Sequence, residues 1–449
     1  MQPEEIFTAD EIRTMRDTLQ SYRPADCYAQ GKWMVSPLNR QWGTRPGAFP
    51  GRVDLRDISM RTMEQMPGVV NSPEERLEYL CELISAGVLH VATSCFRRGH
   101  SVQTMRAEIE AARRIDPASR LMYGNPVRAQ EMQLAAESGY GLVQIWNATY
   151  LGKAMPASAG AVYHRVWQGR DWRDLRFPAD ATEHIGRARR LVAAGRECGL
   201  QVSALVNLIT YTNEDYIAEF CKAMAGDGAC EVILADSSGG CGPEAIARLV
   251  QVARAAAPDI PIGVHTHNLF GLAVATSLAG ARAGAQIIEV SVNGYEVGPA
   301  GVQASLASTA AALEALYGVS TDIDLSRMYS IAQRGAKLTG IAIPWNEPIL
   351  GSAILETAGA DEYEQEARFD PLIHSAVTAA LSGAVRSSGI GITTGPLGMQ
   401  EKLNELGLQI DKPLVEPILK ACLDLMLQVR RPLADEEIRG LARAVKDRE

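Results

Sequence analysis

Two histidines separated by one residue are the side chains of this chain best suited to metal chemistry. His265 and His267 follow directly after a short apolar run, Pro261-Ile262-Gly263-Val264. Side chains two positions apart on a strand point to the same side, so both imidazoles are expected to converge. Imidazole is a common ligand of divalent metals. The pattern predicts a metal site at a strand end, although two polar residues that merely end a strand would show the same spacing.

Carboxylates and arginines that could complete such a site follow the first predicted strand. They are Arg56, Asp57, Arg61 and Glu64, and a Pro-Gly turn comes after them. A carboxylate that joins two histidines makes a three-ligand set with open positions for substrate oxygens. An arginine nearby could stabilise an enolate or hold a carboxylate with two parallel hydrogen bonds. Ion pairing at a strand end is the alternative interpretation.

The ends of other predicted strands supply candidate substrate contacts. Ser94 ends the second strand and is followed by the adjacent arginines Arg97 and Arg98, which suit an anionic substrate. Asn147 ends the fourth strand, and Asn293, which follows the last one, could add an oxygen ligand to the metal. We predict Ser94, Arg97 and Asn147 as substrate-binding residues, with a solvated surface as the alternative.

Apolar, β-branched runs alternate with helical patterns from about residue 52 to residue 316. This rhythm predicts a (β/α)8 TIM barrel over residues 51–320, preceded by an N-terminal arm over 1–50 and followed by a mostly helical domain over 321–449. An open doubly wound sheet would alternate similarly. The connection over 150–182 is long enough to act as a lid over the barrel mouth. The eight strands are expected at 52–60, 88–94, 120–123, 141–147, 201–207, 230–235, 260–265 and 286–292. In the C-terminal domain, helices are expected at 324–338, 371–385, 399–406, 413–428 and 434–446.

Composition narrows the class of protein. The net charge of -9 and the lack of a basic run argue against nucleic acid as a partner. No apolar stretch is long enough to span a bilayer, and the acidic N-terminus does not resemble a signal peptide. The eight cysteines form no CxxC pair, which favours reduced thiols in a cytoplasmic protein.

Three motifs together resemble the DRE-TIM metallolyase superfamily. This superfamily includes 2-isopropylmalate and homocitrate synthases, 4-hydroxy-2-oxovalerate aldolases and hydroxymethylglutaryl-CoA lyases. The stretch from His265 to Ala279 is close to the family pattern HxHN…GLAxANSLA. Residues 57–69 are similar to DTTLRDGEQxPGV, and residues 236–239 to the DTxG turn. Asn293-Gly294 is similar to the NG that opens the last loop.

The resemblance implies roles for individual residues. Arg61 matches the catalytic arginine of the family and Glu64 its glutamate, whereas Thr62 falls on the metal-ligand aspartate. A threonine hydroxyl is a poorer ligand than a carboxylate for a hard cation. We therefore expect His265 and His267 to hold a divalent metal (Mg, Mn or Zn), with Asp57 as the nearest substitute carboxylate and Asn293 assisting. Metal binding is expected to be weakened, rearranged or absent relative to the family.

The implied activity is formation or cleavage of a carbon–carbon bond next to a 2-oxo acid or carboxylate group, through a metal-stabilised enolate. A synthase-like acyl transfer of the aldol or Claisen type, with an acyl-CoA as a possible second substrate, is the main hypothesis. The segment over 354–360 lacks the histidines of the corresponding synthase motif, which makes ordinary leucine-pathway condensation a poor match. A retro-aldol lyase that works without CoA, or a catalytically silent regulatory homologue, are the alternatives. The resemblance also favours a homodimer.

Overall fold

The computed structural model describes residues 7–21, 23, 26–41, 49–94, 101–124, 126, 129–148, 181–296, 301–357 and 360–447. The chain forms two compact units. One unit comprises residues 38–342, and the other combines residues 1–37 with residues 343–449. Residues 1–37 thus group with the C-terminal part of the chain, and the boundaries at 50 and 320 stay predictions.

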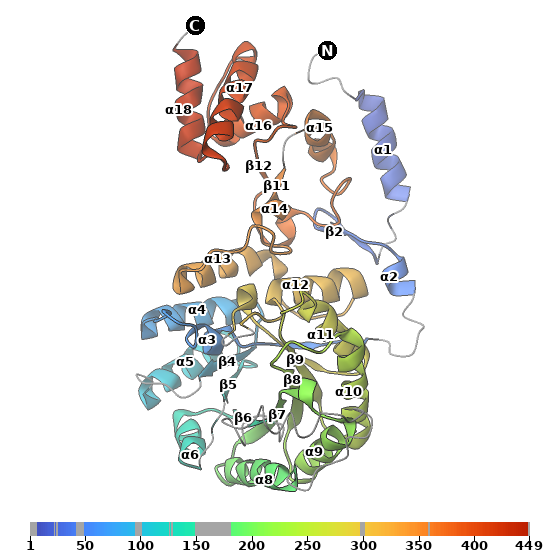
Figure 1. Cartoon of the computed structure of the whole chain (residues 1–449), viewed down its shortest axis with the longest axis vertical. Coiled ribbons are helices and arrows are strands. Elements are labelled where there is room, and N and C mark those ends of the chain that lie inside the picture. Colours follow the sequence, from blue (N-terminus) through green and yellow to red (C-terminus); the bar gives the residue numbers. More distant parts are fainter. Residues whose placement is uncertain are drawn as a thin grey trace, which may run out of the picture. The chain divides into compact units, whose positions relative to one another are not determined.

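The unit over 38–342 is built on eight parallel strands that close into a barrel in the order β10-β3-β4-β5-β6-β7-β8-β9 (Figure 1). This closed sheet confirms the predicted TIM barrel and excludes the open sheet. Each strand lies within a few residues of its predicted position. The strands are β3 (Asp54–Asp57), β4 (His90–Ser94), β5 (Arg120–Gly124), β6 (Leu142–Ala148), β7 (Gln201–Asn207), β8 (Glu231–Asp236), β9 (Ile262–Thr266) and β10 (Ile287–Val290).

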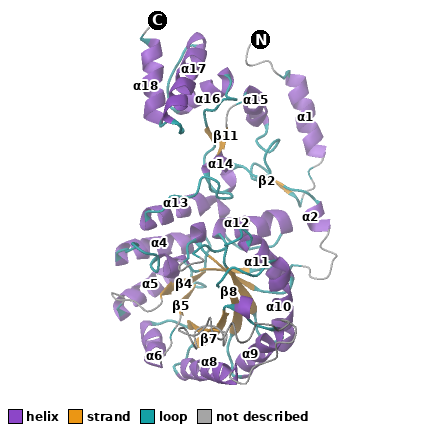
Figure 2. Ribbon diagram, viewed as in Figure 1, coloured by secondary structure: helices purple, strands orange, loops and turns teal. Residues whose placement is uncertain are grey.

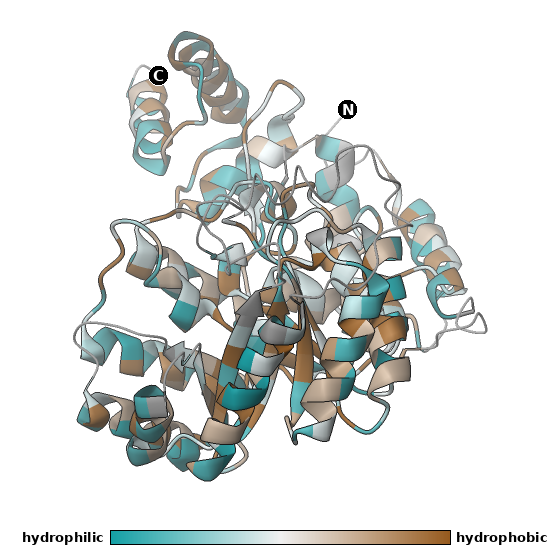
Figure 3. Cartoon of the chain, turned by 60° about the horizontal axis from the view of Figure 1, so that its bottom comes forward, coloured by the Kyte–Doolittle hydropathy of each residue, from teal (hydrophilic) through white to brown (hydrophobic). Residues whose placement is uncertain are grey.

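Helices surround the barrel strands (Figure 2). Their starts follow local signals: α4 and α5 begin with capping boxes at Ser72 and Ser101, and α10 has proline in its first turn. In α10 the buried residues Ile246, Leu249, Val250 and Ala253 recur at helical spacing and face the strands. Figure 3 shows brown apolar residues on the strands and teal polar residues on the helices around them. The helices are α2 (Leu38–Gln41), α3 (Ser59–Met63), α4 (Pro73–Ser85), α5 (Val102–Ile115), α6 (Ala129–Ser138), α8 (Ala181–Glu197), α9 (Glu214–Gly226), α10 (Pro243–Ala256), α11 (Ala273–Arg282), α12 (Leu306–Ala311) and α13 (Met328–Thr339).

Strand register places charged residues side by side inside the barrel. Arg56 on β3 is the register partner of Glu289 on β10, and Glu289 is in turn the partner of His265 on β9. All three side chains are buried, with 2% or less of Arg56 and Glu289 exposed. A buried charge is tolerated only when it is paired, so this level of the barrel is organised by ion pairs.

The second unit is mostly helical, and its three C-terminal helices pack around an apolar core that includes Met399, Leu403, Ile418 and Cys422. The helix predicted over 371–385 is wrong. In this segment the backbone pairs with the hairpin of β1 (Tyr28–Ala29) and β2 (Trp33–Met34): Met34 N–H donates to Ala376 O, and Thr378 N–H donates to Lys32 O. The helices and short strands of this unit are α1 (Ala9–Ser21), α14 (Ser352–Leu355), β11 (Glu356–Thr357), α15 (Asp361–Phe369), β12 (Ser387–Ser388), α16 (Pro396–Glu405), α17 (Lys412–Val429) and α18 (Asp435–Lys446).

Within the described ranges, no helix combines the length and the apolar character that crossing a membrane requires.

Candidate metal centre at the barrel mouth

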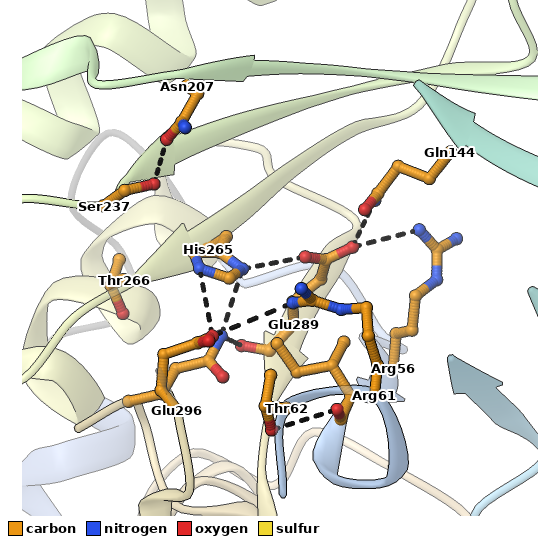
Figure 4. Close-up of polar contacts among 12 residues, drawn as sticks. Arg56, Arg61, Thr62, Gln144, Asn207, Ser237, His265, Thr266, Glu289 and Glu296 are labelled. Atoms are coloured by element: carbon orange, nitrogen blue, oxygen red, sulfur yellow. Dashed lines mark hydrogen bonds and ion pairs between the residues drawn. The ribbon is translucent and has the colours of Figure 1, made fainter. Parts of the chain in front are cut away.

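Two histidines and a glutamate converge at the carboxyl end of β9. His265 lies on β9, His267 follows it, and Glu296 lies in the loop after β10 (Figure 4). The two Nε2 atoms are 3.2 Å apart, and Glu296 Oε2 lies 3.7 Å from His265 Nε2 and 4.0 Å from His267 Nε2. All three side chains are buried. These are the described residues that could hold a metal ion together.

The size of this group fits a divalent cation. A point equidistant from the three atoms lies about 2.1 Å from each, which matches the bonds of zinc to histidine nitrogen and carboxylate oxygen. Charge favours a cation as well. The group contains one carboxylate, that of Glu296, which is buried with the two imidazoles. The residues present therefore fit the metal that the resemblance implies.

Arg61 lies beside this group. It is buried on α3, with its Nη2 3.8 Å from Glu296 Oε2. Its guanidinium carbon lies 4.6 Å from the centre of the half-buried Trp146 ring on β6. A cation over an aromatic face is held by the quadrupole of the ring. Trp146 and Glu296 together fix a permanent positive charge next to the two histidines.

A chain of polar contacts reaches the histidines from the barrel interior. His265 Nδ1 lies 2.9 Å from Glu289 Oε2, and Glu289 Oε1 contacts Arg56 and Gln144. Burial alone would raise the pKa of Glu289. The hydrogen bond with His265 lowers that pKa, and the charges of Arg56 and Arg61 act in the same direction, so that the pKa of Glu289 lies at about 2. Glu289 is therefore an ionised acceptor at neutral pH.

The carboxylate predicted as third ligand lies elsewhere. Asp57 ends β3, and its oxygens accept hydrogen bonds from the backbone N–H and the hydroxyl of Ser59 at 3.0 and 2.5 Å. Since Arg56 points into the barrel, its neighbour Asp57 points outward, toward the helices. The metal-compatible group of the described residues contains Glu296 in place of Asp57.

Asn293 and Thr62 also make structural contacts. The amide nitrogen of Asn293 donates to the hydroxyl of Tyr295 and to the carbonyl of Ala332 on α13, both at 2.9 Å. Asn293 adopts a left-handed backbone conformation with φ 53°. The hydroxyl of Thr62 donates to the carbonyl of Tyr295 at 2.8 Å, the shortest of its contacts with backbone carbonyls. These contacts hold the loop after β10, while those of Asn293 involve its amide nitrogen, so that its role as an oxygen ligand stays a prediction.

Glu64 belongs to a separate cluster of charges. It forms an ion pair with Arg76 on α4, which also binds Glu108 on α5 at 3.0 Å and the carbonyl of Thr93 at 2.6 Å. Burial raises the pKa of Glu108, although Arg76 opposes this effect. Glu64, Arg76 and Glu108 line a cavity of about 700 Å³ between the starts of α4 and α5. The sequence-predicted pair Arg61 and Glu64 is therefore divided between two sites.

Three predicted substrate contacts are not placed by the structure. Arg97 and the connection over 150–180 lie outside the described residues. For Ser94 and Asn147 only the backbone is described, at the ends of β4 and β6. Their roles remain predictions.

A second polar group orders the neighbouring strand ends. Asp236, at the end of β8, accepts hydrogen bonds from Gly240 N–H at 3.1 Å and Cys241 N–H at 2.8 Å. Ser237 donates to Asn207 at the end of β7 (Figure 4). These contacts make Asp236 a cap of the turn that follows β8.

Sequence reasoning missed Glu289, Glu296 and Gln303. An acidic residue inside the otherwise apolar run Ile287-Ile288-Glu289-Val290 was an available signal for Glu289. Glu296 stands in a loop that departs from the family pattern, so it was not aligned with any ligand. Gln303 is brought to His265 by backbone pairing of residues 302–304 with residues 266–268, which local sequence does not reveal.

A closed parallel barrel with histidine and carboxylate ligands at the carboxyl ends of its strands is the architecture of a (β/α)8 metal-dependent enzyme. The model of the HMGL-like family matches residues 52–334. The chain belongs to this family, which confirms the predicted DRE-TIM resemblance.

Relatives and solved structures agree with this assignment. The chain is 28% identical over 371 residues to 2-isopropylmalate synthase of Methanocaldococcus jannaschii; the match covers 81% of this chain and 65% of that enzyme, just under two thirds of its length. It is 28% identical to homocitrate synthase AksA of Methanopyrus kandleri over 93% of this chain and 99% of that one. It is 30% identical to 2-phosphonomethylmalate synthase of Streptomyces rubellomurinus, over 67% and 74%. Hydroxymethylglutaryl-CoA lyase of Pseudomonas aeruginosa shares the fold, with a TM-score of 0.53 and 18% identity over 66% of this chain and 95% of that chain.

Proposed function

We propose that this chain is a synthase that forms a carbon–carbon bond by adding an enolate to a small 2-oxo acid. The observation that carries the proposal is the convergence of His265, His267 and Glu296 beside the buried guanidinium of Arg61. The named relatives support the reaction type, because three of them are 2-isopropylmalate, homocitrate and 2-phosphonomethylmalate synthases. An acyl-CoA is the proposed enolate donor, as the family resemblance implies for a synthase.

His265, His267 and Glu296 would hold the divalent cation, whose positive charge lowers the free energy of a developing enolate. Arg61 is placed to bind an oxyanion or carboxylate of the substrate, because its guanidinium is permanently charged and fixed on Trp146. Burial of the whole group excludes water and strengthens each electrostatic interaction. Glu64 is ion-paired with Arg76, which makes it a weak candidate for moving the proton.

The two alternatives, a retro-aldol lyase and a catalytically silent homologue, differ in whether they need a cation site. A retro-aldol lyase would share the site, but the lyases among the solved structures are under 20% identical and support the fold alone. A catalytically silent homologue requires no cation site. The fit of three buried donor atoms to one ion favours an enzyme.

Metal analysis combined with a substrate screen tests the proposal. Purified protein is expected to carry about one Mg, Mn or Zn ion per chain, and the His265→Ala/His267→Ala variant none. With acetyl-CoA and a panel of 2-oxo acids, the intact protein should release free CoA thiol, and a chelator should abolish the release. Cleavage of longer 2-oxo acid aldols without CoA would favour the lyase. A metal-free protein of unchanged stability would favour the silent homologue.

We also propose that the protein is a homodimer, as the family resemblance implies. Light scattering of the purified chain is expected to give twice the 48.5 kDa mass of one chain. A monomer would contradict this part of the proposal alone.

A further inference from the structure

We propose that Glu289 is a positioning residue that keeps the hydrogen of His265 on Nδ1, so that the Nε2 lone pair faces His267 and Glu296. This inference rests on the proposed function, because it assigns Nε2 of His265 to the cation. It concerns a residue that is buried in the barrel below the metal-compatible group and does not itself belong to that group.

The orientation of a neighbouring amide determines what Glu289 can do. The indole N–H of Trp146 lies 3.0 Å from Gln144 Oε1. An indole nitrogen is only a donor, so the oxygen of Gln144 must face it and the NH₂ group of Gln144 must face away. That NH₂ group lies 2.5 Å from Glu289 Oε1. The positions of the oxygen and the nitrogen in the Gln144 amide therefore follow from the indole N–H of Trp146, which can only donate.

Glu289 Oε1 consequently receives two donors. Besides the NH₂ group of Gln144, Arg56 Nη1 lies 3.3 Å from it, and an arginine can only donate. The remaining oxygen, Oε2, lies 2.9 Å from His265 Nδ1. The permanently charged guanidinium of Arg56 pairs with Glu289 and favours its carboxylate form, so Oε2 accepts and Nδ1 donates. A neutral imidazole with its hydrogen on Nδ1 carries its lone pair on Nε2.

Gln303 competes for the same ring nitrogen. Its Nε2 lies 3.1 Å from His265 Nδ1 and 3.3 Å from the carbonyl of Glu289. If Gln303 donated to Nδ1, the hydrogen of a neutral His265 would have to be on Nε2. Hydrogen bonds with an ionised partner are roughly twice as strong as neutral ones. The contact with Glu289 therefore determines the tautomer, and Gln303 supports the ring through the backbone carbonyl of Glu289.

A glutamine at position 289 should reverse this arrangement. The amide oxygen of the Glu289→Gln side chain would accept from both Arg56 and Gln144, which leaves its NH₂ group facing Nδ1. His265 would then carry its hydrogen on Nε2, and no lone pair would face the metal group. Outer partners of metal-ligating histidines typically contribute about 10- to 100-fold to metal affinity, and we expect a loss in this range.

Glu231→Gln is the matched control. Glu231 is buried in the same barrel and binds the same nitrogen of Arg56 at 2.6 Å, with no contact to His265. Both variants remove one buried negative charge beside Arg56. If Glu289 acted only by compensating Arg56, the two variants would behave alike.

The experiment combines ¹⁵N NMR of the histidine rings with calorimetric titration of Zn²⁺. In the metal-free protein, long-range ¹⁵N–¹H spectra assigned with a His265→Asn variant should show His265 protonated on Nδ1. The hydrogen should move to Nε2 in Glu289→Gln and stay on Nδ1 in Glu231→Gln. Zn²⁺ affinity should fall about 10- to 100-fold in the first variant and less than threefold in the second.

Two results would overturn the inference: a wild-type His265 with its hydrogen on Nε2, or equal losses of affinity in the two variants. The first is measured on the unmodified protein, so it remains decisive even if a variant does not fold. A wild-type protein that shows the Nδ1 hydrogen but binds no Zn²⁺ would contradict the proposed function and leave the role of Glu289 in orienting His265 supported.

Discussion

The hydroxyl of Thr62 donates a 2.8 Å hydrogen bond to the carbonyl of Tyr295, the residue directly before Glu296. Thr62 stands where the family resemblance leads one to expect a ligand carboxylate. In this chain it holds the backbone of the loop that supplies Glu296 instead. Ser59 makes a parallel link, since its hydroxyl accepts from Val292 N–H at 2.8 Å. Helix α3 thus fastens the β10 loop that carries the alternative carboxylate.

The Thr62→Val variant tests this link. Valine keeps the shape and removes the hydroxyl, which leaves the buried carbonyl of Tyr295 without this donor. We expect Zn²⁺ affinity to fall by up to about tenfold, since a hydrogen bond contributes about 1 kcal/mol. Calorimetric titration measures the change. Thr62→Ser, which retains the hydroxyl, should bind Zn²⁺ like the original, and equal binding by the valine variant would show that the hydroxyl does not position Glu296.

Replacing the carboxylates of Glu296 and Asp57 by amides, one at a time, tests which of the two binds the metal. Glu296→Gln should weaken Zn²⁺ binding by more than about 100-fold, because even the outer partners of metal ligands contribute 10- to 100-fold. Asp57→Asn should bind Zn²⁺ normally, since Asp57 is hydrogen-bonded to Ser59. Both affinities are measured by titration at pH 7.5. The opposite ranking would restore Asp57 as the third ligand.

Arg61→Lys tests the proposed oxyanion contact. Lysine keeps the positive charge beside Glu296 but loses the planar guanidinium that lies on Trp146. We expect kcat to fall by about 100- to 1000-fold, the usual effect of removing one oxyanion donor, with little change in Zn²⁺ affinity. Steady-state CoA release measures kcat. An unchanged kcat in Arg61→Lys would remove Arg61 from the mechanism.

Asp57 predicts a pH dependence of stability. Burial raises its pKa to about 7, despite the opposing hydrogen bonds from Ser59 and Val292. Between pH 4 and pH 7 the unfolded chain releases this proton and the folded chain retains it, so the free energy of unfolding should decrease as pH rises through this range. A shift of about three units corresponds to at most about 4 kcal/mol.

The comparison for this last prediction is Asp57→Asn, which cannot ionise. Urea unfolding of both proteins at pH 4, 5.5, 7 and 8 gives the difference in unfolding free energy, in which the other titrating groups cancel. The difference should change steadily up to pH 7 and level off above it. A pH-independent difference would mean that the Asp57 carboxyl is not shifted in the folded protein.

The architecture of the barrel was predictable because its signals are local. Each strand is a short apolar run, and each helix shows apolar residues with a period of 3.6. The caps at Ser72 and Ser101 directly precede the helices that they start. The segment over 371–385 shows the limit of such signals. Its helical pattern was overridden by backbone pairing with residues 32–34, more than 300 positions earlier in the chain.

The sequence by itself determined the eight-strand rhythm, the family and the two histidines, because alternation along one strand brings His265 and His267 together without help from the rest of the chain. Only the tertiary structure shows which carboxylate lies beside them. Closure of the barrel places β10 between β3 and β9, so that Glu289 contacts His265 and the loop after β10 carries Glu296 into the site. Asp57 is nearer to Arg61 in sequence, but the two-residue period of β3 turns it away from the barrel interior. Which side chains meet in the site depends on strand register across the whole barrel, and not on how close they are along the chain.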